Sequence, residues 1–402
     1  MKTKKKWIKT RHTVVRNLLY WPLYVVCALK YGLKVEKFNG DMNRPYLILF
    51  NHQTAFDQFF TSLAFKKHIY YIASEDLFSN GFVSKLITWL VAPIPFRKST
   101  SDIAAIKNCL RIAKEGGSIG MAPEGNRTYS GTTEYIKPGI ASLVKALKMP
   151  LLLFRIEGGY GVQPRWSDKT RKGKMRVTPS KVIEFEEYSK LSNDELYELI
   201  NKELFVDERL DKTEFYSKHS AEYLDRVIYY CPFCKISEFY SKNDIITCKS
   251  CGKSIRYLPD KTLQGIDFDF PFLYVKDWYD SQTQHMLKLN LEPYKDKHIF
   301  ADRVEFIDNK YCSKKVIVDK DATLMAYSDR FVVATDKEDF VFKYSDINSA
   351  TVLGRNKMNI YVKQNIYQFR GSKHFNALKY LQLYYKTINE EKGELCGKYL
   401  GL

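Results

Sequence analysis

The amino-acid sequence predicts an α/β domain built from a sheet with flanking helices, followed by a short cysteine module and a small β-rich barrel that a carboxy-terminal helix caps. Three observations predict this fold class. Short apolar runs alternate with helical stretches over residues 35–190, which is typical of a sheet covered by helices. Two Cys-x-x-Cys pairs follow. Residues 299–390 then consist of short β-rich runs and one helix.

The composition limits the class of protein. A chain of 402 residues has room for two or three domains, and an apolar content of 45% excludes global disorder. The formal net charge of +18 indicates an anionic partner, which is nucleic acid, an anionic membrane surface or a phosphorylated substrate. The cysteines outside the two pairs are scattered, which does not fit a secreted disulfide framework and favours a reducing, cytoplasmic compartment.

The first 34 residues predict a helix at a membrane interface. Seven of the first sixteen residues are Lys or Arg, and an apolar stretch over 18–29 follows. This stretch is too short to cross a bilayer, which needs about 20 residues, and no signal-peptide cleavage site follows it. We expect residues 1–34 to lie at the cytoplasmic face of the membrane, with Trp21 at headgroup level and the lysines on anionic lipid. An amphipathic helix packed on the domain itself is the alternative.

Residues 35–190 are predicted to form the α/β domain. Strands and helices alternate along this part of the chain, as expected when helices cover both faces of a sheet. We expect strands at 46–50, 68–73, 118–122 and 151–156, and helices at 55–66, 82–91, 103–115 and 140–147.

The first candidate for catalysis is the segment Asn51-His52-Gln53-Thr54-Ala55-Phe56-Asp57, where a predicted strand ends and a helix starts. Catalytic groups collect at this edge of open α/β sheets. His52 can act as a base near neutral pH, and Asp57 can fix its tautomer if the turn folds His52 back over the helix. The structural alternative is that Thr54 and Asp57 only form a capping box.

Two later turns carry cations. The segment 121–128 contains Glu124, Gly125 and Arg127, and the segment 92–98 contains Arg97. A guanidinium group is a forked donor suited to phosphate, so two such turns at one sheet edge would form an anion pocket.

The run Gly116-Gly117-Ser118-Ile119-Gly120 matches the nucleophile elbow of serine hydrolases. That elbow follows a strand and opens a helix, whereas here a helix precedes the run and a strand follows it. We therefore interpret it as a turn.

Together the candidate segments resemble the glycerophospholipid acyltransferase family, which includes the lysophosphatidic acid acyltransferases. The family is marked by Asn-His-x4-Asp, an Arg-containing turn, Pro-Glu-Gly-Thr-Arg and a strand opened by Pro. The corresponding segments here are 51–57, 94–97, 123–127 and 149–156. The sequence departs from the pattern at Asn126, where the family usually has Thr, and at Ser74 and Glu75, near which the family often has Lys.

The resemblance implies an acyltransferase of phospholipid biosynthesis. His52 would deprotonate the hydroxyl of a lysophospholipid, foremost 1-acyl-sn-glycerol-3-phosphate, and Asp57 would orient His52. The hydroxyl would attack an acyl thioester of coenzyme A or acyl carrier protein, giving phosphatidic acid. Arg97 and Arg127 would hold the phosphate of the lipid substrate, in a pocket shaped by Glu124 and Gly125. This chemistry needs no catalytic metal.

The two cysteine pairs predict a structural Zn²⁺ site. Cys231 and Cys234 form one pair, and Cys248 and Cys251 form the other. Four thiolates in two knuckles make a closed tetrahedral zinc site, and a rubredoxin-type iron site is the alternative. Residues 229–257 resemble a zinc ribbon. Their flanks carry no dense basic-aromatic stripe, which disfavours nucleic acid as a partner.

The remaining segments complete the predicted organisation. We expect a helical linker at 191–228, a second linker with one helix at 258–298, and a β domain at 299–390 that resembles the pleckstrin-homology (PH) or GRAM-like fold. A second functional hypothesis is a non-catalytic membrane or nucleic-acid adaptor, built on a decayed acyltransferase domain, that works through the zinc ribbon and the PH-like domain. The intact His52, Asp57, Glu124 and Arg127 favour the enzyme.

Overall fold

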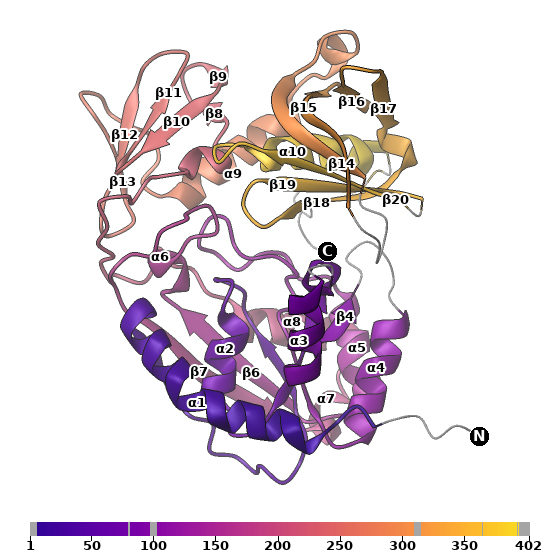
Figure 1. The fold of residues 1–402 in the computed structure, drawn as a ribbon. Helices are drawn as coiled ribbons and strands as arrows, with labels where there is room; N and C mark the ends of the chain where they lie inside the picture. The colour runs from indigo at the N-terminus through magenta and orange to yellow at the C-terminus, as the bar shows by residue number, and fades with distance from the viewer. Residues whose placement is uncertain are drawn as a thin grey trace. The chain divides into compact units, whose positions relative to one another are not determined.

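The computed structural model describes residues 6–78, 81–96, 103–308, 315–363, 365–391 and 393. The contacts between residues divide the chain into two compact units (Figure 1). Unit 1 runs to Arg165 and continues over Thr170–Phe215, and unit 2 consists of Trp166–Lys169 and the described residues from Tyr216 to Gly393.

Unit 1 contains a seven-stranded sheet with the strand order β1-β7-β6-β2-β5-β3-β4. Strands β6, β2, β5, β3 and β4 are parallel to one another, whereas β7 runs antiparallel to β6 and parallel to β1. The bounds of the strands are β1 Leu33–Val35, β2 Leu47–Phe50, β3 Ile69–Ser74, β4 Ile94–Phe96, β5 Ser118–Met121, β6 Leu151–Glu157 and β7 Met175–Ile183. The helices are α1 Thr10–Tyr31, α2 Asp57–Ala64, α3 Phe82–Val91, α4 Ile103–Lys114, α5 Gly139–Leu147, α6 Gly159–Val162, α7 Phe185–Tyr188 and α8 Asn193–Leu204, with a 3₁₀ turn at Glu75–Phe78.

The sheet separates two apolar cores because successive side chains of a strand point to opposite faces. Leu47 and Leu49 of β2 enter one core, and Ile48 and Phe50 enter the other. The first core is closed by α4, α5 and α8, and the second by α1 and α2. Buried on both faces, the central strands read as continuous apolar runs, which is why the sequence predicts them.

Several parts of unit 1 differ from the sequence expectation. Strand β7 was not predicted, because its sequence MRVTPSKVI mixes cations and a proline with apolar residues. Helix α2 begins at Asp57 and not at residue 55, and its N-cap position is Phe56 without a side-chain cap. Residues expected in a helical linker form α8, whose Leu196, Ile200 and Leu204 are buried in the first core.

Unit 2 begins with two small antiparallel sheets. One pairs β8 with β9, and the other has the order β10-β11-β12-β13. The bounds are β8 Tyr230–Cys231, β9 Lys235–Ile236, β10 Phe239–Lys242, β11 Ile245–Cys248, β12 Ser254–Tyr257 and β13 Leu263–Gly265, after a 3₁₀ turn at Leu224–Arg226. Helix α9, Val275–Lys288, packs against them through Trp278, whose Nε1 donates to the carbonyl of Tyr230 at 2.7 Å. The helix expected within the second linker is therefore part of the core of unit 2.

The carboxy-terminal part of unit 2 is a curled antiparallel sheet with the order β17-β16-β15-β14-β20-β19-β18 (Figure 1). Its strands are β14 Phe300–Asp308, β15 Val316–Ala326, β16 Arg330–Ala334, β17 Asp339–Lys343, β18 Ile347–Leu353, β19 Lys357–Val362 and β20 Asn365–Gly371. Helix α10, Ala377–Glu391, packs on it, and 3₁₀ turns lie at Glu292–Tyr294 and Tyr344–Asp346. No pairing joins β17 to β18 in the described residues, so the small β-rich barrel that the sequence predicted is a curled half-barrel.

Among the helices that the structure describes, none has both the length and the apolar character needed to cross a bilayer.

Candidate active site

The segment after β2 is anchored by Asn51. The side-chain amide of Asn51 donates to the carbonyl oxygen of Ile156 at 2.8 Å, and its Oδ1 accepts from the Ile156 N–H at 2.7 Å. Asn51 is buried. This pair of bonds fixes the end of β2 against β6, so that the next residue, His52, leaves the sheet at a defined point.

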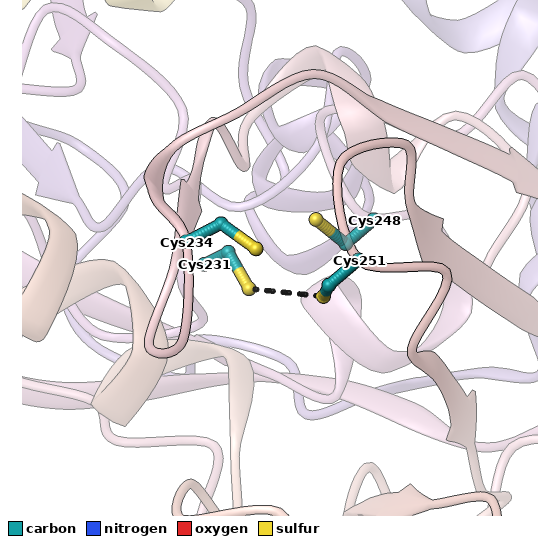
Figure 2. A group of neighbouring side chains, drawn as sticks. All are labelled: Cys231, Cys234, Cys248 and Cys251. Carbon is teal, nitrogen blue, oxygen red and sulfur yellow. Dashed lines mark hydrogen bonds between the residues drawn. The ribbon is translucent and has the colours of Figure 1, made fainter.

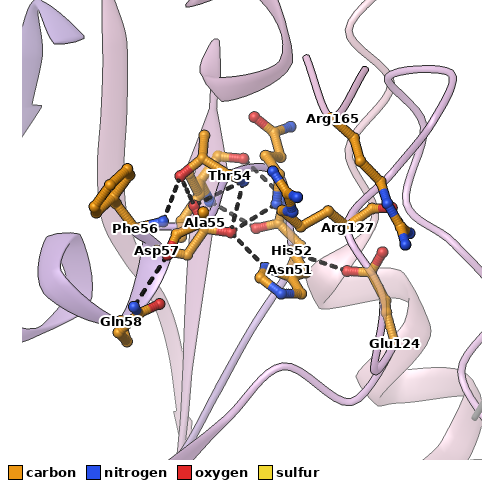
Figure 3. A network of polar contacts seen from close by, with 12 residues as sticks. Asn51, His52, Thr54, Ala55, Phe56, Asp57, Gln58, Glu124, Arg127 and Arg165 are labelled. Carbon is orange, nitrogen blue, oxygen red and sulfur yellow. Dashed lines mark hydrogen bonds and ion pairs between the residues drawn. The ribbon is translucent and has the colours of Figure 1, made fainter. Parts of the chain in front are cut away.

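His52 and Asp57 meet, as we expected from the sequence. The Nδ1 atom of His52 lies 2.8 Å from Oδ2 of Asp57 (Figure 3). The Asp57 side chain is fully buried, whereas the His52 side chain is 23% exposed. Because a carboxylate can only accept, Nδ1 carries the proton in this bond, and Nε2 keeps its lone pair to receive one.

Asp57 also holds the turn that carries His52. Its carboxylate accepts from the N–H of Gln53 at 2.7 Å, from the N–H of Thr54 at 3.0 Å and from Thr54 Oγ1 at 2.7 Å. Thr54 Oγ1 in turn accepts from the N–H of Phe56. The predicted capping box of Thr54 and Asp57 is not formed, because the N-cap of α2 is Phe56 and has no side-chain cap. The Asp57 carboxylate instead closes the turn before α2 and also contacts the imidazole.

Glu124 joins the His52 segment to the turn after β5. Its Oε1 accepts from the N–H of His52 at 2.6 Å, and its Oε2 accepts from the N–H of Glu134 at 2.7 Å (Figure 3). The carbonyl of His52 accepts from the N–H of Thr128 at 3.0 Å. Both backbone polar groups of His52 are thus held by the segment 124–128. Burial raises the pKa of Glu124 well above its usual range, although the two backbone donors lower it.

The turn itself requires Gly125, whose φ of 67° is in the left-handed region that favours glycine. Arg127 follows and is partly exposed. Arg165, which lies outside the recognised motifs, is buried, and its Nη1 donates to the carbonyl of Arg127 at 3.0 Å while its guanidinium stacks 4.0 Å above the ring of Tyr129. Figure 3 shows Arg127 and Arg165 from neighbouring segments beside His52 and Glu124. Arg97 lies outside the described residues.

Ser118 has no place in this site. It is the first residue of β5, it is buried, and its Oγ accepts from the N–H of Tyr46 at 3.1 Å. A strand follows the glycine turn, as the sequence predicted, so the residue cannot occupy a nucleophile elbow.

Sequence reasoning missed Gln53 and Glu208. Gln53 is buried next to His52, and its Nε2 donates to Oε1 of Glu208 at 2.8 Å. The two residues are 155 positions apart, so no local pattern could join them. The only signal in the sequence was the glycine-rich segment 158–161, which contacts Gln53.

Comparisons with known proteins find acyltransferases. The Acyltransferase family model matches residues 33–157. The 1-acyl-sn-glycerol-3-phosphate acyltransferase of Bacillus subtilis is 23% identical over 175 residues, which are 43% of this chain and 84% of that protein. The chloroplastic enzyme of the same name from Brassica napus, BAT2, is 25% identical over 35% of this chain, and LPAT1 of Arabidopsis thaliana is 24% identical over 41%. The chain spans less than half the length of these two plant relatives, 41% and 47%.

A search of solved structures finds the 1-acyl-sn-glycerophosphate acyltransferase PlsC from Thermotoga maritima, with a TM-score of 0.41 and 20% identity over 51% of this chain and 82% of that one.

By class, the chain is an acyltransferase enzyme. Residues 33–157 match the Acyltransferase family model, and this match and the relatives above support the resemblance to the glycerophospholipid acyltransferase family seen in the motifs.

Unit 2 brings together the four cysteines of the predicted metal site. Their Sγ atoms all lie within 4.8 Å of one another, and those of Cys231 and Cys251 are 3.9 Å apart (Figure 2). Sulfurs at the corners of a ZnS₄ tetrahedron with Zn–S bonds of about 2.3 Å are roughly 3.8 Å apart. The donor set and its spacing therefore fit a structural zinc ion.

Proposed function

We propose that the chain transfers a fatty acyl group from acyl-CoA or acyl carrier protein to the hydroxyl of 1-acyl-sn-glycerol-3-phosphate, giving phosphatidic acid. The observation that carries the proposal is the 2.8 Å contact between His52 Nδ1 and Asp57 Oδ2 at the end of a central parallel strand. The names of the relatives from Bacillus subtilis and the two plants support the choice of acceptor.

In this mechanism His52 is the general base. Its Nε2 takes the proton of the acceptor hydroxyl as the oxygen attacks the thioester carbonyl, forming a C–O bond. The C–S bond then breaks, and the thiolate leaving group receives the proton from His52. Asp57 keeps the imidazole in the required tautomer and stabilises the imidazolium that forms.

Arg127 and Arg97 are proposed to bind the phosphate of the acceptor. Arg127 follows the Glu124–Gly125 turn, which is bonded directly to the backbone of His52. A phosphate held there would bring the acceptor hydroxyl to the base, because hydrogen bonds join the segment that carries Arg127 to the segment that carries His52. Glu124 and Gly125 shape this pocket.

Two helices of unit 1 are proposed to attach the enzyme to the cytoplasmic face of an anionic membrane. Helix α1 packs one side on the domain through Cys27 and Tyr31. Its other side exposes Leu18, Trp21 and Leu29, which are 71%, 67% and 83% exposed. Helix α3 contacts α1 and exposes a second apolar set, Phe82, Val83, Leu86 and Trp89. Large apolar side chains beside Lys and Arg are typical of helices that lie in the interface.

The test of the proposed reaction is an acyl-transfer assay with the purified full chain. It compares 1-acyl-sn-glycerol-3-phosphate with lysophosphatidylcholine as acceptors, each with acyl-CoA and with acyl carrier protein as donor carriers. We expect phosphatidic acid from the first acceptor and little product from the second, because only a terminal phosphate fits a site built on Arg127. Equal transfer to both acceptors would contradict the proposed substrate, and no transfer to any acceptor would favour the adaptor hypothesis.

A further inference from the structure

The side chain of Gln53 is bonded at both ends inside unit 1. Its Nε2 donates to Oε1 of Glu208 at 2.8 Å, and its Oε1 accepts from the N–H of Tyr160 at 3.2 Å. Gln53 is 2% exposed. Its backbone N–H donates to Asp57 Oδ2, the oxygen that also contacts His52. Gln53 therefore connects the turn that carries His52 to Glu208 and to the backbone of Tyr160.

Glu208 is a buried acceptor that reaches this turn from a distant part of the chain. Its Oε1 accepts from the N–H of Gly158 at 2.6 Å as well as from Gln53, and its own N–H donates to the carbonyl of Gly131 at 3.0 Å. It is 2% exposed. Residue 208 lies beyond residues 33–157, the part that matches the family model. A buried carboxylate with several donors is costly to remove, because each donor then loses its partner.

The glycines at 158 and 159 allow this close approach. Gly158 has a φ of +79°, which favours glycine. A Cβ on Gly159 would lie 2.7 Å from Oε1 of Gln53 and 2.9 Å from its Cβ, and 3.0 Å from Cγ2 of Thr54. Distances below 3.0 Å cannot be tolerated without movement, so any side chain at 159 would push on the turn that carries His52.

We propose that Glu208, acting through Gln53, is a positioning residue that holds the imidazole of His52 in line with the acceptor hydroxyl. The inference rests on the proposed function of His52 as the base. When Glu208 is replaced by an apolar residue, Gln53 loses its acceptor and the turn relaxes. The phosphate site on the other turn is attached through Glu124, so the acceptor still binds while the proton transfer slows.

The kinetic test compares Glu208→Leu with Glu208→Gln in the full chain. An amide oxygen can still accept from Gln53 and Gly158, so Glu208→Gln keeps kcat within about threefold of the wild type. Glu208→Leu lowers kcat by about 10- to 100-fold while the KM for 1-acyl-sn-glycerol-3-phosphate stays within about threefold, as expected for a displaced catalytic group. Gln53→Leu gives the same loss, and the double variant is no worse than either single one, because the two side chains act as a unit.

A substitution that adds a methyl group next to Gln53 tests whether the position of this side chain matters. Gly159→Ala is expected to lower kcat by about 10-fold or more, because the new methyl group displaces Gln53. Gly139→Ala is the matched control, since a Cβ there meets no atom within 4 Å, and it leaves kcat unchanged.

A spectroscopic reading separates this inference from the proposed reaction. A proton on His52 Nδ1 bonded to Asp57 gives a downfield proton resonance, which is assigned by its loss in His52→Ala. We expect this resonance in the wild type and in Glu208→Gln, and we expect it to be lost or displaced in Glu208→Leu. The thermal unfolding midpoint of unit 1 shows whether each variant is folded. An unchanged resonance in Glu208→Leu, or a kcat equal to that of the wild type, would overturn the positioning role. An inactive wild type with the expected resonances would instead contradict the proposed reaction and leave the positioning role supported.

Discussion

At the residue scale, the site depends on carboxylates that each serve more than one donor. Asp57 contacts the imidazole of His52 and closes the turn around it, and Glu124 binds the backbone of His52 to the neighbouring turn. In a buried environment such shared acceptors fix geometry, because no water can replace a lost partner. Substitutions at these carboxylates should therefore affect both stability and rate, whereas substitutions of the partly exposed Arg127 should affect substrate binding alone.

Replacing Arg127 by Ala tests the proposed phosphate site. Loss of charge-assisted hydrogen bonds worth about 1.5–3 kcal/mol should raise the KM for 1-acyl-sn-glycerol-3-phosphate by about 10- to 100-fold. We expect kcat to stay within about threefold, because this binding is equal in the ground state and the transition state. Steady-state kinetics measure KM and kcat separately and so test this expectation. Arg303→Ala, at an arginine side chain of unit 2 that is 69% exposed, is the control, and a fall in kcat with unchanged KM for Arg127→Ala would contradict the assignment.

The local part of the site could be predicted from the sequence, and the distant part could not. His52 and Asp57 are five positions apart, so the motif and the strand-to-helix boundary were enough to bring them together. Asn51 bonds a residue 105 positions away, and His52 bonds Glu124 at a separation of 72. Such partners depend on the order of strands in the sheet, which no short motif contains.

At the element scale, the central strands were predictable because both faces of each are buried and their sequences are continuously apolar. Strand β7 was missed because cations and Pro179 interrupt its apolar residues, and its register with β6 shifts between Leu153 and Phe154. Helix α8 was expected as a linker because its polar face dominates its composition, yet three apolar residues at helical spacing bury it in the core.

The junction of α1 with the sheet contains two histidines that should make unit 1 sensitive to acid. Burial lowers the pKa of His12 and of His68 to about 4 in each case. Nearby cations act in the same direction, whereas the hydrogen bond of His68 to the carbonyl of Val91 acts against it. The unfolded chain binds these protons near pH 6.5, the ordinary value. Stability should therefore be complete above about pH 6.5 and decrease as the pH falls toward about 4, by up to about 1.4 kcal/mol per pH unit for each histidine.

Urea unfolding of the full chain between about pH 4.5 and about pH 7.5 measures this dependence. The variant His12→Phe, which keeps a ring of similar size against Tyr70, should show a shallower slope than the wild type. Identical slopes in the two proteins would show that His12 does not titrate with unfolding.

The exposed side of α1 should determine membrane attachment. The double variant Leu18→Asp and Trp21→Asp removes two large apolar side chains from the proposed interface, each worth about 1.5–3 kcal/mol when buried. We expect binding to vesicles of phosphatidylglycerol and phosphatidylethanolamine to weaken by at least about 10-fold. Leu210→Asp is the control, because Leu210 is 77% exposed but lies on neither α1 nor α3. Vesicle sedimentation measures this binding. Equal losses of binding in the double variant and in Leu210→Asp would contradict the proposal that the exposed side of α1 binds the membrane.

At the scale of the whole molecule, the chain combines an acyltransferase domain with a second unit that has its own core. Within unit 2, the cysteine cluster connects the β8–β9 hairpin to the sheet of β10–β13. The cysteine spacing predicted this cluster, because two knuckles can meet around one ion. The inclusion of Trp166–Lys169 in unit 2 could not be predicted, because that segment interrupts the acyltransferase part of the sequence.

The four cysteines of unit 2 are predicted to bind one zinc ion. We expect elemental analysis of the purified chain to find about one zinc per molecule and no equivalent amount of iron. Cys234→Ser should release the metal and lower the unfolding midpoint of unit 2, because four-coordinate zinc stabilises small folds. Cys109→Ser, which removes a thiol from unit 1, should leave the zinc content unchanged. A purified chain that is folded and free of zinc would contradict the assignment.

The central claim is that His52 removes the proton from the acceptor hydroxyl. The most direct test is the single-turnover rate of acyl transfer to 1-acyl-sn-glycerol-3-phosphate for the wild type and for His52→Ala, with the unfolding midpoint and vesicle binding measured in parallel. We predict a rate lower by about 10²- to 10⁴-fold in His52→Ala, with folding and membrane binding preserved. A rate in His52→Ala within about threefold of the wild type would contradict the claim.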